Sequence, residues 1–335
     1  MKLDNKRTVL VGLAFLSICA FWQMYDTVIP KLLTETFHLD ETLSGAIMAA
    51  DNVLALFLLP FFGALSDRTS TRLGRRMPFI LGGTALAVVL MNLLPVFDNA
   101  YAAQPGALKL TMFVLTLGLL LLAMGTYRSP AVALMPDVTP KPLRSKANAI
   151  INLMGAVGGI LYLIVAAALY PNSRTEGLAH VDYQPLFLVV SALMAASVLA
   201  LFLTTNEPKL SAEERAYEAA HPEQQLAEDD GSGHEELPPA VKRSLLFLLL
   251  SIALWYIGYN AVTTWWSTYV ARVMGQGLGG ASKCLLIATG GAIVSYIPIG
   301  QLASKLGRRR TAHKQDIFRD KDYASSDGNR CSVSE

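Results

Sequence analysis

Charged residues are scarce in this sequence: Asp, Glu, Lys and Arg make up 16% of it, whereas apolar residues make up 53%. About a quarter of the residues in a soluble domain are usually charged, so this composition excludes an ordinary soluble protein. The formal net charge of +2 is too small to predict a nucleic-acid partner. The composition instead favours a chain that lies largely in a lipid bilayer.

Cysteine and enzyme motifs are also rare or missing. The three cysteines, Cys19, Cys284 and Cys331, form neither a CxxC pair nor a Cys/His cluster, which argues against a disulfide framework and a zinc site. The sequence contains no HExxH, GxSxG or Walker A motif. We therefore predict no enzyme activity, no cofactor and no metal.

The apolar residues fall into runs that are long enough to cross a bilayer, for which about 20 residues are needed. The first run is too long for a signal peptide and has no clear cleavage site, so we interpret it as a retained helix with a bend at Pro30. Eight membrane helices are predicted, over Val9–Thr36, Thr42–Leu65, Met77–Phe97, Leu108–Val132, Ala147–Tyr170, Gln184–Leu203, Ser244–Val270 and Ser282–Lys305.

Basic residues gather in alternate loops, after the second, fourth and eighth predicted helices. The remaining loops are poorer in Lys and Arg. Because cytoplasmic loops carry the excess of Lys and Arg, this asymmetry predicts a multi-pass protein of the cell membrane with a cytoplasmic N-terminus. The basic residues concerned are Arg68, Arg72, Arg75, Arg76, Lys141, Arg144, Lys146, Arg308, Arg309 and Arg310.

Four regions follow from these patterns. Residues 1–205 form a six-helix transmembrane half, and residues 206–243 form an acidic linker with ten acidic and four basic residues. We expect the linker to be cytoplasmic, partly helical from about Ser211 and otherwise disordered. Residues 244–310 hold two further helices, and residues 311–335 form a polar tail that is expected to be disordered.

The two sides of the linker resemble each other. Ser17-Ile18 begins a stretch that ends in Tyr25-Asp26, and Ser251-Ile252 begins one that ends, at the same offset, in Tyr259-Asn260. Chance similarity between apolar runs is the alternative. A second match, of the segment beginning at Gly63 with that beginning at Gly300, makes chance less favourable. Such internal repeats are typical of secondary transporters.

The segment Gly63-Ala64-Leu65-Ser66-Asp67-Arg68, followed by Gly74-Arg75-Arg76, resembles the signature loop of the major facilitator superfamily. The resemblance implies an all-α membrane protein with a complete N-terminal six-helix half and two helices of the second half. It also implies a conformational latch, a contact that holds the halves in one state. The alternative is that the arginines only mark topology. The latch residues would be Gly63, Asp67, Arg68, Gly74, Arg75 and Arg76.

A narrower resemblance is to the sucrose-transporter-like branch, which is related to the glycoside–pentoside–hexuronide cation symporters. It is carried by Phe21 to Asp26, Asp51-Asn52, Tyr127 to Pro130, Met135 to Asp137 and Arg144 to Asn148. The chain departs from the melibiose-permease pattern, because Ala55 and Leu59 stand where that pattern has two carboxylates. This departure favours proton coupling over sodium coupling.

Three ionisable residues lie well inside predicted helices, where each costs at least about 2.5 kcal/mol. Asp26 and Asp51 are candidate proton or cation sites, because a carboxylate in apolar surroundings binds a proton readily. Arg128 is a candidate partner for them or for the substrate. The alternatives are structural pairing or hydrogen bonding for the aspartates and snorkelling to the interface for Arg128. Asp137 and Arg144 are expected at the interface.

Sugar binding needs an aromatic face for the ring and polar groups for the hydroxyls. The candidates lie on the first, fourth, fifth and seventh predicted helices, which line the central cavity of the fold that the sequence resembles. The alternative for each aromatic residue is the interfacial belt or the core. The predicted substrate-binding residues are Trp22, Tyr25, Tyr127, Asn152, Tyr259 and Asn260. Gly155, Gly158 and Gly159 are predicted close-packing positions.

The sequence changes character after Arg310, and its last 25 residues contain no apolar run. Twelve helices are implied by the resemblance, so we expect a frameshift or truncation here. The rival is a natural eight-helix protein. The predicted function, inferred for the intact parent of which this chain is expected to be a truncated form, is proton-coupled symport of a sugar such as a disaccharide. We expect a monomer, with the lipid bilayer and the two transported species as its partners. The alternatives are a non-transporting remnant and an efflux transporter of another solute.

Overall fold

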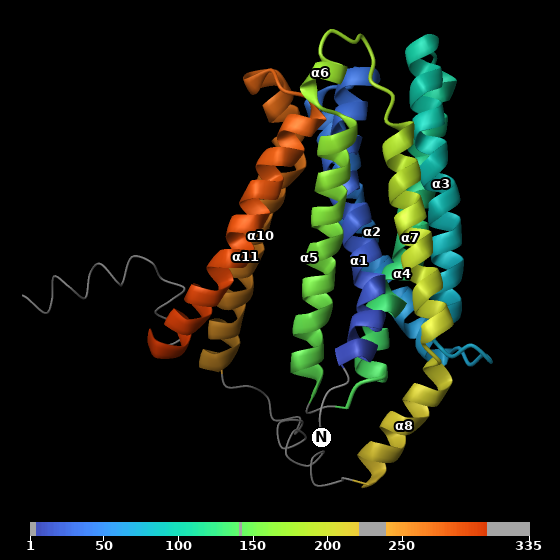
Figure 1. The fold of residues 1–335 in the computed structure, drawn as a ribbon, viewed down its shortest axis with the longest axis vertical. Coiled ribbons are helices and arrows are strands. Elements are labelled where there is room, and N and C mark those ends of the chain that lie inside the picture. Colours follow the sequence, from blue (N-terminus) through green and yellow to red (C-terminus); the bar gives the residue numbers. More distant parts are fainter. Residues whose placement is uncertain (1–4, 141–142, 221–238, 307–335) are drawn as a thin grey trace, which may run out of the picture. The chain divides into compact units, whose positions relative to one another are not determined.

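The computed structural model describes residues 5–140, 143–220 and 239–306. Predictions about Lys141, Arg308 to Arg310, residues 221–238 and the tail lie outside these residues. Two compact units are distinguished, Met1–Lys283 and Cys284–Glu335. Figure 1 labels the α-helices. The elements are α1 (Asn5–Lys31), η1 (Leu32–Thr36), α2 (Glu41–Arg68), α3 (Met77–Ala103), α4 (Ala107–Asp137), α5 (Arg144–Leu169), α6 (Asn172–Thr175), α7 (Gln184–Thr204), α8 (Glu207–Ala220), α10 (Pro239–Met274) and α11 (Leu278–Leu306).

Each of the eight predicted membrane segments coincides with a helix. Among the described residues, seven helices are long and apolar enough to span a membrane: α1 with η1, α2, α3, α4, α5, α7 and most of α10. The eighth predicted segment lies on α11, of which several side chains are outside the description. The prediction of an all-α membrane protein is confirmed.

Several helices extend beyond the apolar runs that predict them. The end of α3 was expected at Phe97, but the helix continues to Ala103 and therefore includes Asp98. The start of the helix in the linker was expected near Ser211, whereas α8 begins at Glu207. Polar residues can continue a helix outside the apolar core, so hydropathy alone does not find these ends.

Local sequence signals explain the starts of two helices. Asp40 precedes α2, and its Oδ2 accepts a hydrogen bond from the Thr42 N–H over 3.0 Å, which satisfies an otherwise free donor of the first turn. The same contact with Thr42 lowers the pKa of Asp40. Pro78 stands in the first turn of α3, where its missing N–H is no loss.

The end of the first predicted helix is irregular. Pro30 lies inside α1, and the chain changes to a π-helical turn, η1, two residues later. Proline removes a backbone donor and clashes with the preceding turn, so an irregularity is expected at this place. η1 then presents Glu35 and Thr36 at the end of the helix.

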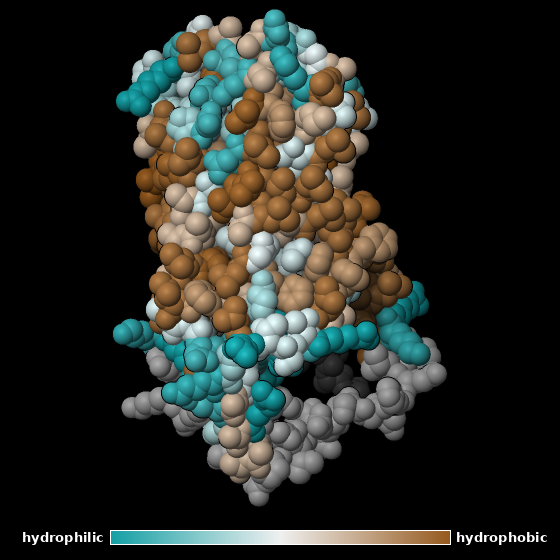
Figure 2. All heavy atoms as spheres, turned by 90° about the vertical axis from the view of Figure 1, so that its right-hand side faces the viewer, coloured by the Kyte–Doolittle hydropathy of each residue, from teal (hydrophilic) through white to brown (hydrophobic). Residues whose placement is uncertain are grey.

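Apolar side chains cover much of the outer surface of the helices. Figure 2 shows one face on which hydrophobic residues form a broad band and hydrophilic residues gather beyond it at both ends. A surface of this kind fits the hydrocarbon layer of a bilayer and its two polar boundaries. Exposed apolar residues on α3 and α7 include Leu86, Val89, Leu93, Val96, Leu188, Val189, Leu199 and Leu203.

The core of the first unit is built around α1, which packs against α5, α7 and α4. Gly155 and Gly158 allow α5 to approach α1 closely. A Cβ atom at Gly155 would lie 2.9 Å from the Cys19 sulfur, and one at Gly158 would overlap the backbone carbonyl of Leu16. The predicted close packing is confirmed at these two glycines. At Gly159 the nearest atom would be 3.7 Å away, an ordinary contact.

Candidate functional site

Three of the predicted transport residues line one small cavity. Trp22 on α1, Asp51 on α2 and Arg128 on α4 surround a space of about 20 Å³, together with apolar side chains of α2 and α4. A volume of this size is enough for about one water molecule. Around this cavity, an aromatic, an acidic and a basic side chain from three different helices therefore lie close together.

Arg128 lies over the ring of Trp22. Its guanidinium carbon is 5.4 Å from the ring centroid, within the range of a cation–π contact. Tyr25 packs edge-on against the same ring, with the two centroids 5.3 Å apart. The indole nitrogen of Trp22 and the hydroxyl of Tyr25 are buried without a hydrogen-bond partner among the described residues. These donors are available to a polar ligand.

Asp51 interacts with its neighbour Asn52 and with the other charges of the site. Its carboxylate accepts bonds from the backbone N–H and the side-chain amide of Asn52, over 2.7 and 2.8 Å. It also interacts electrostatically with Asp26 and with Arg128. Asp26, Asp51 and Arg128 therefore act as one group of coupled charges.

The remaining predicted substrate residues are not gathered around this cavity. Tyr127 is fully buried, and its hydroxyl bonds to Ser17 and, over 2.9 Å, to the carbonyl oxygen of Ala14. Asn152 is exposed on α5. Tyr259 and Asn260 lie on α10, where Tyr259 is 52% exposed.

A second group of charges surrounds Arg76, at the start of α3. This guanidinium bonds to Asp67 and Ser66 at the end of α2 and, over 2.8 Å, to Asp137 at the end of α4. Arg75 adds an ion pair to Asp137 at 3.5 Å. Burial lowers the pKa of Arg76, but the bonds and charges of Asp137 and Asp67 outweigh it, so the pKa is raised. Arg76 therefore joins three helix ends as a fixed cation.

The carboxylate of Glu207 belongs to the same cluster, although no sequence motif marks this residue. It accepts hydrogen bonds from the backbone N–H groups of Arg75, Arg76 and Met77, over 2.7, 2.9 and 2.8 Å. A carboxylate at a helix N-terminus satisfies free donors and interacts favourably with the helix dipole. The start of α8 is thereby attached to the start of α3.

The glycines and Arg68 of the signature loop have different positions. Gly74 has a φ of +115°, and a Cβ atom there would overlap the Glu207 carboxylate, so both the turn and the close approach require glycine. The carbonyl of Gly63 lies 3.5 Å from an Arg76 nitrogen. Arg68 is exposed. The loop positions Arg76 and Glu207 more directly than it positions Arg68.

The family model described as the Major Facilitator Superfamily matches residues 11–313. The chain belongs to this superfamily. Its membership and the all-helical structure indicate a multi-pass membrane transporter rather than an enzyme. The resemblance inferred from the signature loop is thus confirmed.

Two curated relatives show how far the similarity extends. An uncharacterized symporter of Synechocystis is 29% identical over 188 residues, which are 53% of this chain and 34% of the relative. A sucrose transport protein of Arabidopsis thaliana is 29% identical over 147 residues, which are 38% of this chain and 23% of the relative. The chain thus aligns with about a third or less of the length of either protein.

Solved structures support the fold. The partially occluded, inward-open xylose transporter XylE of E. coli aligns with a TM-score of 0.63 and 14% identity, covering 91% of this chain and 74% of that protein. A D-xylose-proton symporter aligns with a TM-score of 0.60 and 16% identity, covering 90% of this chain and 68% of that one. At such low identity the similarity establishes the shared fold.

Proposed function

We propose that this protein is a secondary active transporter that couples the movement of a sugar, such as a disaccharide, to that of a proton across the cytoplasmic membrane. Curated relatives are named as sucrose transport proteins, and one structural neighbour is named as a proton symporter of a sugar. We place the N-terminus in the cytoplasm, because the arginines of the signature loop then face inward. The working unit is a monomer.

The observation that carries the proposal is the grouping of Trp22, Asp51 and Arg128 around one cavity inside the helices. An aromatic face suits the apolar side of a sugar ring, and carboxylate and guanidinium groups suit its hydroxyls. Asp26 and Asp51 supply carboxylates that can take up the coupling proton. Ionisable groups inside a membrane are costly and need such a function.

The contact between Arg128 and Trp22 suggests how sugar and proton are linked. The guanidinium covers the ring face that a sugar would use, at 5.4 Å from the centroid. Arg128 must leave this face when sugar stacks on it, and the nearby charge of Asp51 attracts it. Protonation of a carboxylate changes that attraction, so proton and sugar both control the position of Arg128.

Tyr25, Asn152, Tyr259 and Asn260 remain proposed substrate residues, whereas for Tyr127 we propose a structural role, because its hydroxyl is already bonded to Ser17 and Ala14. Of these, Tyr25 is supported by its contact with Trp22 and its unbonded hydroxyl. The proposed latch is centred on Asp67, Arg75 and Arg76, with Glu207 as an additional member. It would hold one state of the carrier by fixing the cytoplasmic ends of α2, α3 and α4.

The test is uptake of radiolabelled sucrose and of xylose into proteoliposomes that contain the purified chain, under an inward proton gradient. We expect accumulation that a protonophore abolishes, and a roughly 100-fold loss in Asp26→Asn and in Asp51→Asn. Asn52→Ala is the matched control, because it changes a polar neighbour of Asp51 but no charge. Uptake that is independent of the gradient, or of both carboxylates, would contradict proton coupling. Transport of a non-sugar solute alone would favour the efflux alternative.

A further inference from the structure

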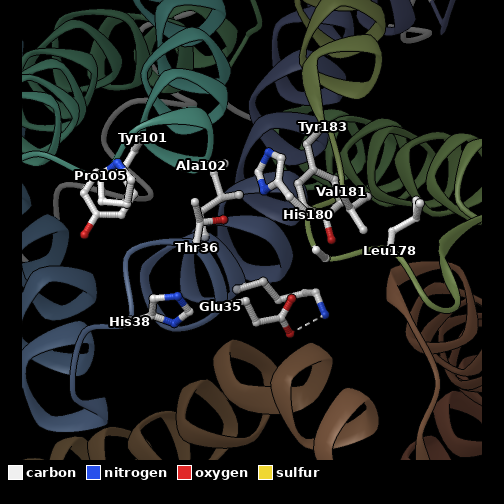
Figure 3. Close-up of a pocket in the computed structure, with 13 residues that line it drawn as sticks. Glu35, Thr36, His38, Tyr101, Ala102, Pro105, Leu178, His180, Val181 and Tyr183 are labelled. Carbon is white, nitrogen blue, oxygen red and sulfur yellow. Dashed lines mark hydrogen bonds and ion pairs between the residues drawn. The ribbon is translucent and has the colours of Figure 1, made fainter.

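A second group of titratable residues lies at the opposite end of the helices from Arg76. A pocket of about 310 Å³ is lined there by η1, by the end of α3 and by the segment that precedes α7. Figure 3 shows Tyr101 and Pro105 on one side, Leu178 to Tyr183 on the other, and Glu35 and His38 below them. Lys31 is 3% exposed and pairs with Glu35 over 2.8 Å. The pocket wall thus contains two histidines, His38 and His180, in addition to the ion pair of Lys31 and Glu35, whose charges cancel.

Asp98 lies behind His180 and is completely buried on α3. The distance between its Oδ2 atom and His180 Nε2 is 3.5 Å. The Thr36 side chain of η1 interacts with this carboxylate, but within the described parts of the chain no hydrogen bond from a charged donor neutralises it. A buried carboxylate in this state is costly unless it is protonated or paired with a cation.

His180 is the group that can supply this cation. Its Nε2 atom is 2.8 Å from Asn99 Oδ1, and the Asn99 amide donates to Asp182 Oδ1 over 2.7 Å. This network assigns an N–H to Nε2, which points between Asn99 and Asp98. A proton added to Nδ1 makes the ring an imidazolium, and its charge then neutralises Asp98.

The other charged groups around the pair already have partners. Lys109 on α4 donates to the carbonyl oxygens of Ala100 and Gln104 over 2.8 and 2.6 Å, and Lys31 pairs with Glu35. No set of three His, Cys, Asp or Glu side chains in the described part of the chain is arranged to hold a metal ion. The titratable groups on the surrounding elements are Lys31, Glu35, His38, Tyr101, Lys109, Tyr170, Asp182 and Tyr183.

We infer that Asp98 and His180 form a second proton-binding site, separate from Asp26 and Asp51, and that its protonation holds the segment 177–181 against α3. Asp182 is anchored independently, because Tyr170 donates to its carbonyl oxygen over 2.8 Å and its carboxylate accepts from the N–H of Gln184 over 2.9 Å. The contact between His180 and Asp98 is therefore the one in this segment whose strength changes with protonation. A charge-assisted bond from His180 to Asp98 is stronger than a neutral one. At acidic pH the segment 177–181 is therefore held more tightly against α3, on this side of the pocket.

In the proposed orientation this site faces outward, but its test requires neither that orientation nor transport. We would measure hydrogen–deuterium exchange of residues 176–183 by mass spectrometry at pH 5.0 and pH 7.5, corrected for the intrinsic pH dependence of exchange. Protection is expected to rise at pH 5.0, by about tenfold if the charged bond adds roughly 1.4 kcal/mol.

Three variants separate the pair from its surroundings. His180→Gln keeps a donor for Asn99 but cannot take up a proton, and Asp98→Asn keeps the shape of the buried group. Both should lose the pH dependence, whereas His38→Gln, in the same pocket, should keep it. Thermal unfolding confirms that each variant is folded. Equal protection of the wild type at both pH values, or a pH effect that persists in Asp98→Asn, would overturn the inference.

Discussion

In each of two regions of this protein a central arginine interacts with aspartates, but the interactions differ. Arg76 is hydrogen-bonded to Asp67 and to Asp137 at the ends of three helices. Arg128 instead lies over Trp22 and interacts with Asp51 electrostatically. The same residue types thus form a fully bonded cluster in one region and a loosely bonded group in the other.

The difference indicates which charges are able to move. Several short bonds from one guanidinium require a single arrangement, because moving Arg76 would break all of them together. A cation–π contact is weaker and less directional, and Arg128 can exchange it for a carboxylate. We therefore expect mutations of the Arg76 cluster to change stability and mutations of the Trp22 site to change transport.

The largest effect is expected for Arg76→Ala. Removing the cation leaves Asp67 without this partner and leaves Asp137, which is 19% exposed, with only its 3.5 Å ion pair to Arg75 among the contacts described above. The loss should be about 3 kcal/mol, the low end for breaking a buried pair, because Asp67 is partly exposed. The measurement is the thermal unfolding midpoint of the purified protein in detergent.

The matched control for this variant is Arg68→Ala. Arg68 is an exposed arginine of the same loop, and its removal should change stability by less than about 0.5 kcal/mol. Equal effects of the two substitutions would show that the loop arginines act only through their net charge, as the topology-marker alternative holds.

Arg128→Lys tests the same comparison at the Trp22 site. Lysine keeps the charge but lacks the planar group that stacks on Trp22, so sugar uptake should fall by about tenfold with little change in the unfolding midpoint. The reverse pattern is expected for Arg76→Lys, because one ammonium cannot bond in the same geometry to Asp67, Ser66 and Asp137. If both variants lose stability alike, the two regions do not differ as described.

The helices of this fold are largely predictable from hydropathy, because a bilayer demands long apolar segments of limited length. Their polar ends are less predictable. Asp98 was placed one residue beyond a membrane helix, since the apolar run stops at Phe97, whereas α3 continues to Ala103. This small error hid a buried carboxylate. The residues that follow Phe97 continue the helix in the structure, and extending the predicted helix over them would have placed Asp98 inside it.

The site was predictable where rare residues stand inside apolar runs. Asp51, Arg128 and Trp22 were found in this way, and the structure brings them to one cavity. The partners of Glu207 lie 130 residues or more earlier in the chain, so no local pattern shows the contact. For Tyr127 the sequence predicts a substrate contact, but it does not show that the hydroxyl is already bonded inside the core.

Glu207→Gln tests whether the fixed cluster needs this distant carboxylate. Glutamine keeps one acceptor for the start of α3 but loses the charge that interacts with the helix dipole. Stability should fall by about 1 kcal/mol. Glu213→Gln, on the same helix, is the control, because Glu213 is half-exposed and its contact with Arg7 is long, at 3.5 Å. An unfolding midpoint that is unchanged in Glu207→Gln would contradict the role of Glu207.

Trp22→Phe should have the smallest effect, because a phenyl ring keeps an aromatic face but binds a cation less strongly and is smaller than indole. The apparent affinity for sugar should change by about threefold, since the contact with Arg128 and the stacking surface are reduced together. Tyr127→Phe is the matched aromatic control. It removes bonds to Ser17 and Ala14 inside the core, and should cost about 1 kcal/mol of stability without changing sugar affinity. The opposite result, in which Tyr127→Phe weakens sugar binding and Trp22→Phe does not, would contradict this assignment. It would mean that Tyr127 contacts the substrate in another state of the carrier and is not a fixed part of the core.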